Sequence, residues 1–290
     1  MALLAEHGLA ARLRARGYDA AAEEIPEPEV RDREIARTFE IDRRVARAVR
    51  SAIDQNRLPV VLSGNCNSSL GTTAALAGRL GVLWFDAHAD FDLPDDNRSG
   101  FFDVMALSTL TGSCWAALRE TIPGFRVIPE SSVVLVGVRD LEPYQRERLD
   151  ASAVRVAYAG ESGQRAVEDT AVAHVEALAP DVDGLYVHVD LDSLDDSYGR
   201  ANEYASPFGL TLEQVARIVA AARARRVGRS GRSRSPPTTR RSTTTDASPP
   251  PPSKRSKPFS NQPAPDDASR NFSQPSLANS IGCAGAGVPR

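Results

Sequence analysis

Residues 82–90 read Val-Leu-Trp-Phe-Asp-Ala-His-Ala-Asp, an apolar run that ends in side chains able to bind a metal ion. Consecutive apolar residues predict a strand that is buried on both faces, as in a parallel sheet. Asp86, His88 and Asp90 occupy alternate positions, and alternate residues of an extended chain point to one side. Open α/β sheets place their ligands at the carboxyl ends of the strands. The stretch therefore predicts a metal site at that edge; the alternative is an exposed acidic turn with a hydrogen-bonded histidine.

A second segment of the same kind follows further along the chain. Residues 185–189 read Leu-Tyr-Val-His-Val and precede Asp190 and Asp192. Close carboxylates repel one another and are costly to bury without a counter-charge. Two cations would neutralise the carboxylates of both segments, and mixed carboxylate and imidazole ligands favour Mn²⁺, Fe²⁺ or Zn²⁺. His188, inside this run, is either a partner that orients a ligand or a hydrogen-bonded core histidine.

Other short apolar runs alternate with helical patterns. We expect further strands at 59–62, 133–137 and 154–158. Helices are expected at 3–16, 30–56, 68–80, 101–111, 143–150, 163–179 and 211–226. Strands that alternate with helices predict one three-layer α/β/α domain with a mainly parallel sheet, over residues 1–226.

The composition changes after Arg226. Residues 227–290 contain 11 of the 20 prolines and few aliphatic residues, so we expect a disordered Pro/Ser/Arg-rich tail. The only lysines of the chain, Lys254 and Lys257, also lie there. Two interpretations remain open: a natural basic tail, or a frameshifted reading of what was once a further strand and helix.

Charge divides at the same boundary. The tail carries a formal charge of +7 and residues 1–226 a charge of −10. An acidic body favours cations, either metals or a small basic substrate, and argues against nucleic acid as a partner. Three scattered cysteines form no disulfide framework, and no apolar stretch reaches the length of a membrane span. We expect a cytoplasmic protein without a membrane partner.

The two acidic segments together are similar to a known family. Asp-Ala-His-Ala-Asp at 86–90, followed by Asp-Leu-Asp-Ser-Leu-Asp at 190–195, resembles the arginase/agmatinase/formiminoglutamase (ureohydrolase) family. The similarity extends over roughly residues 1–215. It implies an arginase-like fold, is compatible with a homo-oligomer, and implies hydrolysis of a linear non-peptide C–N bond in a small cationic amidino or guanidino compound.

The resemblance also implies roles for individual residues. Two divalent ions, Mn²⁺ in most of the family, would be bridged by Asp86 and Asp190. His88 and Asp192 would complete one site, and Asp90 would belong to the other. A hydroxide shared by the ions would attack the substrate carbon. Substrate binding falls on Asp92, Ser99 and Gln214.

Several positions depart from the family pattern. Cys66 replaces a histidine ligand of the first metal loop; it either binds a metal, favouring Zn²⁺ or Fe²⁺, or is a small buried residue beside a weak or absent metal. Asp103 replaces a proton-transferring histidine and is either the catalytic acid–base group or a helix-terminal charge. Gln214 stands where the family has a glutamate that pairs with the substrate, and both ends look altered or truncated. Two hypotheses follow: an active hydrolase, or a catalytically impaired metal-binding relic.

Overall fold

The computed structural model describes residues 8–29, 33–160, 164–200, 206–227 and 281–286. Its strands are β1 (Ala20–Ile25), β2 (Leu58–Leu62), β3 (Leu80–Phe85), β4 (Val133–Val136), β5 (Arg155–Ala157), β6 (Gly184–Val189) and β7 (Ile281–Ala286). Its α-helices are α2 (Leu9–Ala15), α3 (Glu34–Asp54), α4 (Ser68–Ala74), α5 (Ala106–Leu110), α6 (Ala116–Arg119), α7 (Pro143–Ala151), α8 (Gln164–Leu178) and α9 (Leu212–Val227). Short 3-10 turns cover Asp103–Met105, Glu130–Ser132, Leu191–Ser193 and Asp196–Tyr198.

A four-stranded parallel sheet forms the centre of the described fold. Its order is β5-β4-β3-β6, so β3 lies between two neighbours. The register pairs Trp84 with Leu135 of β4 and with His188 of β6. Each of these strands overlaps a predicted strand, and all their pairings are parallel, which confirms the mainly parallel sheet.

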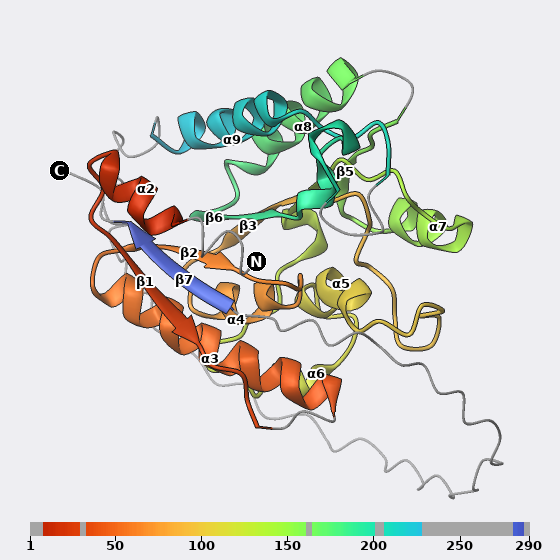
Figure 1. Cartoon of the computed structure of the whole chain (residues 1–290). Helices are drawn as coiled ribbons and strands as arrows, with labels where there is room; N and C mark the ends of the chain where they lie inside the picture. Colours follow the sequence, from red (N-terminus) through yellow and green to blue (C-terminus); the bar gives the residue numbers. More distant parts are fainter. Residues whose placement is uncertain (1–7, 30–32, 161–163, 201–205, 228–280, 287–290) are drawn as a thin grey trace, which may run out of the picture. The chain divides into compact units, whose positions relative to one another are not determined.

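Alternate residues of these strands enter two separate cores. Val82, Trp84 and Leu135 pack on the face covered by α3, α4 and α5, whereas Leu83 and Phe85 pack on the face covered by α8 and α9. Figure 1 shows these helices on opposite sides of β3 and β6. The arrangement is the predicted three-layer α/β/α fold, because strands buried on both faces need helices on both faces.

A second sheet departs from the prediction. β7 lies between β1 and β2 and pairs with both in antiparallel fashion, so β2 is not hydrogen-bonded to the four parallel strands. β1 was not predicted because Ala-Ala-Ala-Glu-Glu-Ile lacks β-branched and aromatic residues before its last position. Residues 281–286 fall in the predicted disordered tail, yet backbone pairing on both sides forms a strand there. Residues 228–280 and 287–290 lie outside the described residues.

The helix α4 begins directly after the loop that carries Cys66, and a close approach to α3 fixes its position. A Cβ atom on Gly71 would lie 2.4 Å from the Asp42 carbonyl oxygen, so only glycine fits. The Gly71 N–H donates to the buried Asp42 carboxylate at 3.2 Å. Within the described residues, no helix is both long and apolar enough to cross a membrane.

The double-sided burial of the sheet can be tested at Leu135, which is fully buried in β4. Leu135→Ala should lower the free energy of unfolding by about 2–5 kcal/mol, because the sheet relaxes little around the lost side chain. Leu212→Ala is the matched control, since Leu212 is 51% exposed at the start of α9, and it should change stability by less than about 0.5 kcal/mol. Urea unfolding measures both; equal effects would contradict the two-core arrangement.

Candidate metal centre

The ends of β3 and β6 bring the two acidic segments together. Phe85 and Val189 are partners in the parallel register, so the residues that follow them leave the sheet at one edge. The Asp190 N–H donates to the Phe85 carbonyl oxygen at 2.8 Å, and the Asp86 N–H donates to the Val136 carbonyl oxygen at 3.0 Å. Asp86 and Asp190 therefore lie side by side, as the strand ends predicted.

Both segments then turn in the same way. The His88 N–H donates to Asp86 Oδ1 at 2.8 Å, and the Asp192 N–H donates to Asp190 Oδ1 at 2.9 Å. Such local bonds from an aspartate to the backbone two residues on define Asx turns. The expected extended chain through residue 90 is thus corrected: β3 ends at Phe85, and Asp90 has a left-handed φ of 48°. The side chains meet through turns and not through strand periodicity.

One cluster of ligand atoms comprises Asp86, His88 and Asp192, whose donor atoms lie within 4.8 Å of one another. His88 Nδ1 is 3.5 Å from Asp86 Oδ1 and 3.5 Å from Asp192 Oδ2. The carboxylates are 1% and 4% exposed. Burial opposes a charge on His88, but the two carboxylates outweigh it and raise the pKa of His88 to about 11. The group has the donors of a metal site, with a proton held where a cation would bind.

A second cluster comprises Cys66, Asp86 and His188, again within 4.8 Å. Cys66 is 5% exposed, and its Sγ lies 3.3 Å from His188 Nε2 and 3.3 Å from Asp190 Oδ2. Burial and four surrounding aspartates raise the pKa of the thiol. Burial lowers the pKa of His188 to about 3, so the ring is neutral. Cys66 is therefore both buried and placed among ligand atoms, and Asp86 is common to both clusters.

Asp90 adds a further buried carboxylate. It is 8% exposed, and its Oδ2 atom has no hydrogen-bond partner within the described part of the chain. Burial and the negative charges of Asp86, Asp103 and Asp190 raise its pKa well above the usual value. A buried carboxylate oxygen without a donor is costly, and a cation is the partner that would satisfy it.

Asp103, predicted as the acid–base group, anchors the loop that carries Cys66. Its Oδ1 accepts from the Asn67 N–H at 3.0 Å and from Asn67 Nδ2 at 2.9 Å, and its Oδ2 accepts from Asn65 Nδ2 at 3.2 Å. Burial raises the pKa of Asp103 to about 6 against these bonds. The residue also begins a 3-10 turn, so its carboxylate fixes the position of the loop beside the cluster.

Both the sequence and the fold of this chain are similar to those of known proteins. The model of the arginase family matches residues 13–230. The chain belongs to the arginase family. Arginase from Staphylococcus aureus (strain COL) is 29% identical over 161 residues, which cover 54% of this chain and 53% of that protein. Arginase from Bacillus caldovelox is 31% identical over 174 residues, which cover 57% and 56%.

Structural similarity agrees with the family assignment. The structure of Bacillus caldovelox arginase superposes with a TM-score of 0.64 at 27% identity, covering 77% of this chain and 79% of that one. Bacillus cereus arginase, at 24% identity and a TM-score of 0.57, shows the same fold. In sequence, the chain spans about half the length of the curated relatives it matches. Resemblance and fold class are both confirmed.

The three residues expected to bind substrate have other contacts in this arginase-family chain. Asp92 is 3% exposed and accepts bonds from Tyr144 Oη at 3.2 Å and Gln145 Nε2 at 3.0 Å. Gln214 is 4% exposed, and its Oε1 accepts from the Thr211 N–H at 2.8 Å while Thr211 Oγ1 accepts from the Gln214 N–H. That exchange is a capping box, which Thr-x-x-Gln before α9 signals in the sequence. Ser99 is exposed in a turn with Asn97.

Arg139 has a larger structural role than its sequence indicated. Its guanidinium donates to the carbonyl oxygens of Gly137, Asp192, Ser193, Leu194, Ser206 and Pro207, at 2.7–3.5 Å. The arginine thereby ties the end of β4 to the segment that carries Asp192. The sequence signals this role weakly, through an arginine that follows directly on a buried strand.

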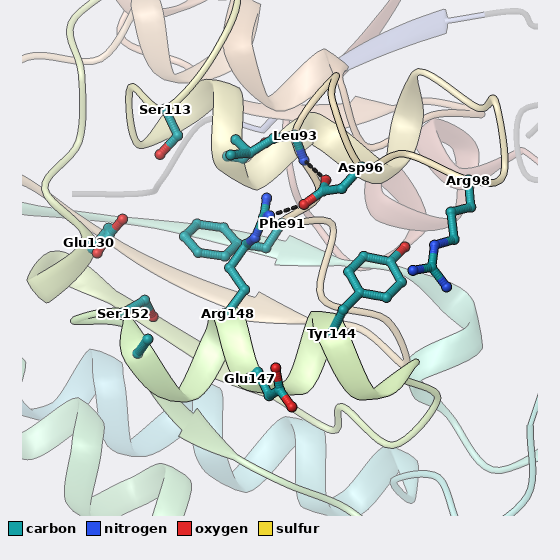
Figure 2. A pocket seen from close by; sticks show the side chains of 12 residues that line it. Phe91, Leu93, Asp96, Arg98, Ser113, Glu130, Tyr144, Glu147, Arg148 and Ser152 are labelled. Atoms are coloured by element: carbon teal, nitrogen blue, oxygen red, sulfur yellow. Dashed lines mark hydrogen bonds and ion pairs between the residues drawn. The ribbon is translucent and has the colours of Figure 1, made fainter.

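A cavity of about 650 Å³ lies beside α7, and none of the predicted metal ligands lines it. Figure 2 shows Phe91 and Arg148 at its centre, Tyr144 and Arg98 to one side and Glu130 to the other. Arg148 forms an ion pair with Asp96, whose other oxygen accepts from the Leu93 N–H. Neither Cys66 nor any of the predicted aspartate and histidine ligands lines the cavity.

The buried carboxylates predict how the stability of metal-free protein depends on pH. Burial raises the pKa of Asp190 to about 7 and that of Asp103 to about 6, above an unfolded value of about 3.9. Their protonated forms stabilise the fold fully below about pH 4, and this contribution is lost as the pH rises towards 7. With a chelator present, the melting temperature should fall between about pH 4 and about pH 7. Excess Mn²⁺ should reduce the fall; a flat or rising profile would contradict this.

Arg139→Lys tests the tie between β4 and the Asp192 segment. Lysine keeps the charge but lacks the planar fork that reaches several carbonyls, so stability should drop by about 1–3 kcal/mol and Mn²⁺ should bind more weakly. Arg146→Lys is the control, because Arg146 pairs with the exposed Asp150; it should cost less than about 1 kcal/mol. Thermal unfolding and metal titration measure both. Unchanged Mn²⁺ affinity in Arg139→Lys would show that Arg139 does not support metal binding.

Proposed function

We propose that this chain is a metal-dependent hydrolase of the ureohydrolase type, which cleaves a linear, non-peptide C–N bond in a small amidino or guanidino compound. The observation that carries the proposal is the pair of ligand clusters that share Asp86. Membership of the arginase family supports the same reaction class. We also propose that the native metal ions are divalent, with Mn²⁺ expected from the family resemblance.

The residues present fit a pair of divalent cations. Asp90 Oδ2 has no hydrogen-bond partner among the described residues, and the negative charges of Asp86 and Asp192 add to burial in raising the pKa of Asp190. Divalent cations would offset this crowding of carboxylates. In the proposed centre, Cys66, Asp86, His88, Asp90, Asp190 and Asp192 hold the ions. When bound, two divalent cations activate water and stabilise the charge that develops on the substrate.

The chain's own residues orient these groups. His88 Nδ1 faces the ligand cluster while its Nε2 lies 3.9 Å from Asp140 Oδ2. Asp140 is more than half exposed, so beside the cluster it offers a negative charge to a cationic amidinium group. As a metal ligand His88 would be the neutral imidazole, so cation binding there would release a proton. Asp103 keeps the Cys66 loop in place throughout.

A second candidate function is a metal-binding protein that has lost turnover. It is favoured by the contacts of Asp92 and Gln214, which place their side chains in loop and helix-cap bonds. Such a protein would bind metal at the same cluster and release no product. Turnover therefore separates the two functions, and metal binding alone does not.

The test pairs metal analysis with product release. Full-length protein should bind two metals per chain and release urea or ammonia from arginine, agmatine, guanidinobutyrate or formiminoglutamate. Asp192→Asn should weaken metal binding by more than the roughly 10–100-fold that loss of an outer partner costs, and turnover should fall with it. Asp54→Asn, at the exposed end of α3, should change neither.

The outcomes separate the candidates. Two bound metals without turnover of any of the four compounds would favour the relic. No bound metal in excess Mn²⁺, Fe²⁺ or Zn²⁺ would exclude both functions. Equal metal affinity in Asp192→Asn and Asp54→Asn would show that the cluster is not the site.

A further inference from the structure

His188 is held so that one ring nitrogen faces the Cys66 thiol. Its ring stacks on the indole of Trp84 with centroids 3.8 Å apart and an interplanar angle of 20°. Its Nδ1 atom lies 3.0 Å from Tyr186 Oη, and its Nε2 atom lies 3.3 Å from Cys66 Sγ. A histidine that binds metal through one nitrogen has its other nitrogen held by a partner of this kind.

The distance between sulfur and nitrogen suits a shared ion. Zn–S bonds of about 2.3 Å and Zn–N bonds of about 2.0 Å at a tetrahedral angle place the two donors about 3.5 Å apart. Cys66 Sγ and His188 Nε2 are 3.3 Å apart, and an Asp86 oxygen completes the cluster within 4.8 Å. Three protein donors with one position open are the ligand set of a catalytic zinc site.

The two clusters differ in chemical character. Asp86, His88 and Asp192 offer two carboxylates and one imidazole, whereas Cys66, Asp86 and His188 offer a thiol, an imidazole and one carboxylate. Thiolate and imidazole ligands select Zn²⁺, while oxygen-rich sites suit Mn²⁺. The difference lies in Cys66 and His188, because Asp86 is common to both.

We propose that His188 is a metal ligand, and that with Cys66 and Asp86 it forms a Zn²⁺-selective position beside an oxygen-rich position at Asp86, His88 and Asp192. The centre is then asymmetric, with Zn²⁺ on the sulfur side and Mn²⁺ on the oxygen side. His188 supplies the imidazole that the loop lacks at Cys66. This inference deepens the proposed function, since it concerns the same centre, but it does not require turnover.

Cobalt and zinc probe the position directly. Co²⁺ added to metal-free, full-length protein should give a thiolate-to-cobalt charge-transfer band in the near ultraviolet, which Cys66→Ser should abolish. X-ray absorption of protein loaded with one equivalent of Zn²⁺ should show one sulfur at about 2.3 Å and nitrogen at about 2.0 Å. Absence of sulfur from both spectra of the unmodified protein overturns the proposal, whatever any variant does.

His188→Gln tests the imidazole itself. It should weaken Zn²⁺ binding by at least on the order of 100-fold and remove one imidazole from the zinc absorption spectrum. His174→Gln, on α8 outside both clusters, is the matched control and should change neither. A His188→Gln protein that keeps the zinc affinity and the imidazole signal shows that His188 only packs beside the site. If this variant fails to fold, His188→Cys should retain Zn²⁺ and add a second sulfur, and a single sulfur would overturn the assignment.

The two proposals fail separately. If Zn²⁺ is bound through sulfur but the protein turns over none of the four compounds, the proposed function is wrong and His188 remains a ligand. Turnover by a protein that holds two Mn²⁺ ions and binds Zn²⁺ without sulfur removes this inference and leaves the hydrolase.

Discussion

Asp86, Asp90 and Asp192 are each more than nine-tenths buried at one edge of the parallel sheet, where their charges repel one another. His88 lies between two of the carboxylates, which raise the pKa of its imidazole to about 11 and so favour a positive charge there. The surrounding structure holds this arrangement against its repulsion. Asx turns fix both acidic segments, Asp103 fixes the Cys66 loop, and Arg139 fixes the segment that carries Asp192. Because these bonds keep the carboxylates from moving apart, a bound cation is the means by which their repulsion would be reduced.

The chemistry of the centre follows from which atoms meet there. Family resemblance alone places a cysteine where a histidine is usual and suggests a weakened metal position. In the structure, the imidazole of His188 on β6 lies 3.3 Å from that cysteine, so the position has both a nitrogen and a sulfur donor. The two residues are 122 positions apart in the sequence. An altered motif is therefore a poor measure of lost function until the neighbouring strands are known.

The predictability of the fold varied with the source of each element's stability. β3, β4 and β6 were predicted because burial on both faces requires consecutive apolar residues, which are visible in the sequence. β1 and β7 were not predicted, because Ala- and Gly-rich segments carry no such signal. They become strands through backbone pairing: β7 pairs with β1 on one side and with β2 on the other. Helix α4 was predicted too long for a similar reason: local composition does not show where neighbouring segments stop it.

The sequence by itself determined the family, the fold class and the edge of the sheet at which Asp86 and Asp190 gather. Those features depend on local patterns: apolar runs that end in acids, at spacings that parallel strands bring together. Only the tertiary structure decided that Arg139 ties β4 to the Asp192 segment and that His188 faces Cys66. A side chain's partner depends on register and turn geometry, which set distances of a few ångströms between residues remote in the chain. Sequence patterns indicate which apolar runs become buried strands, and three-dimensional packing fixes which strands pair and which atoms touch.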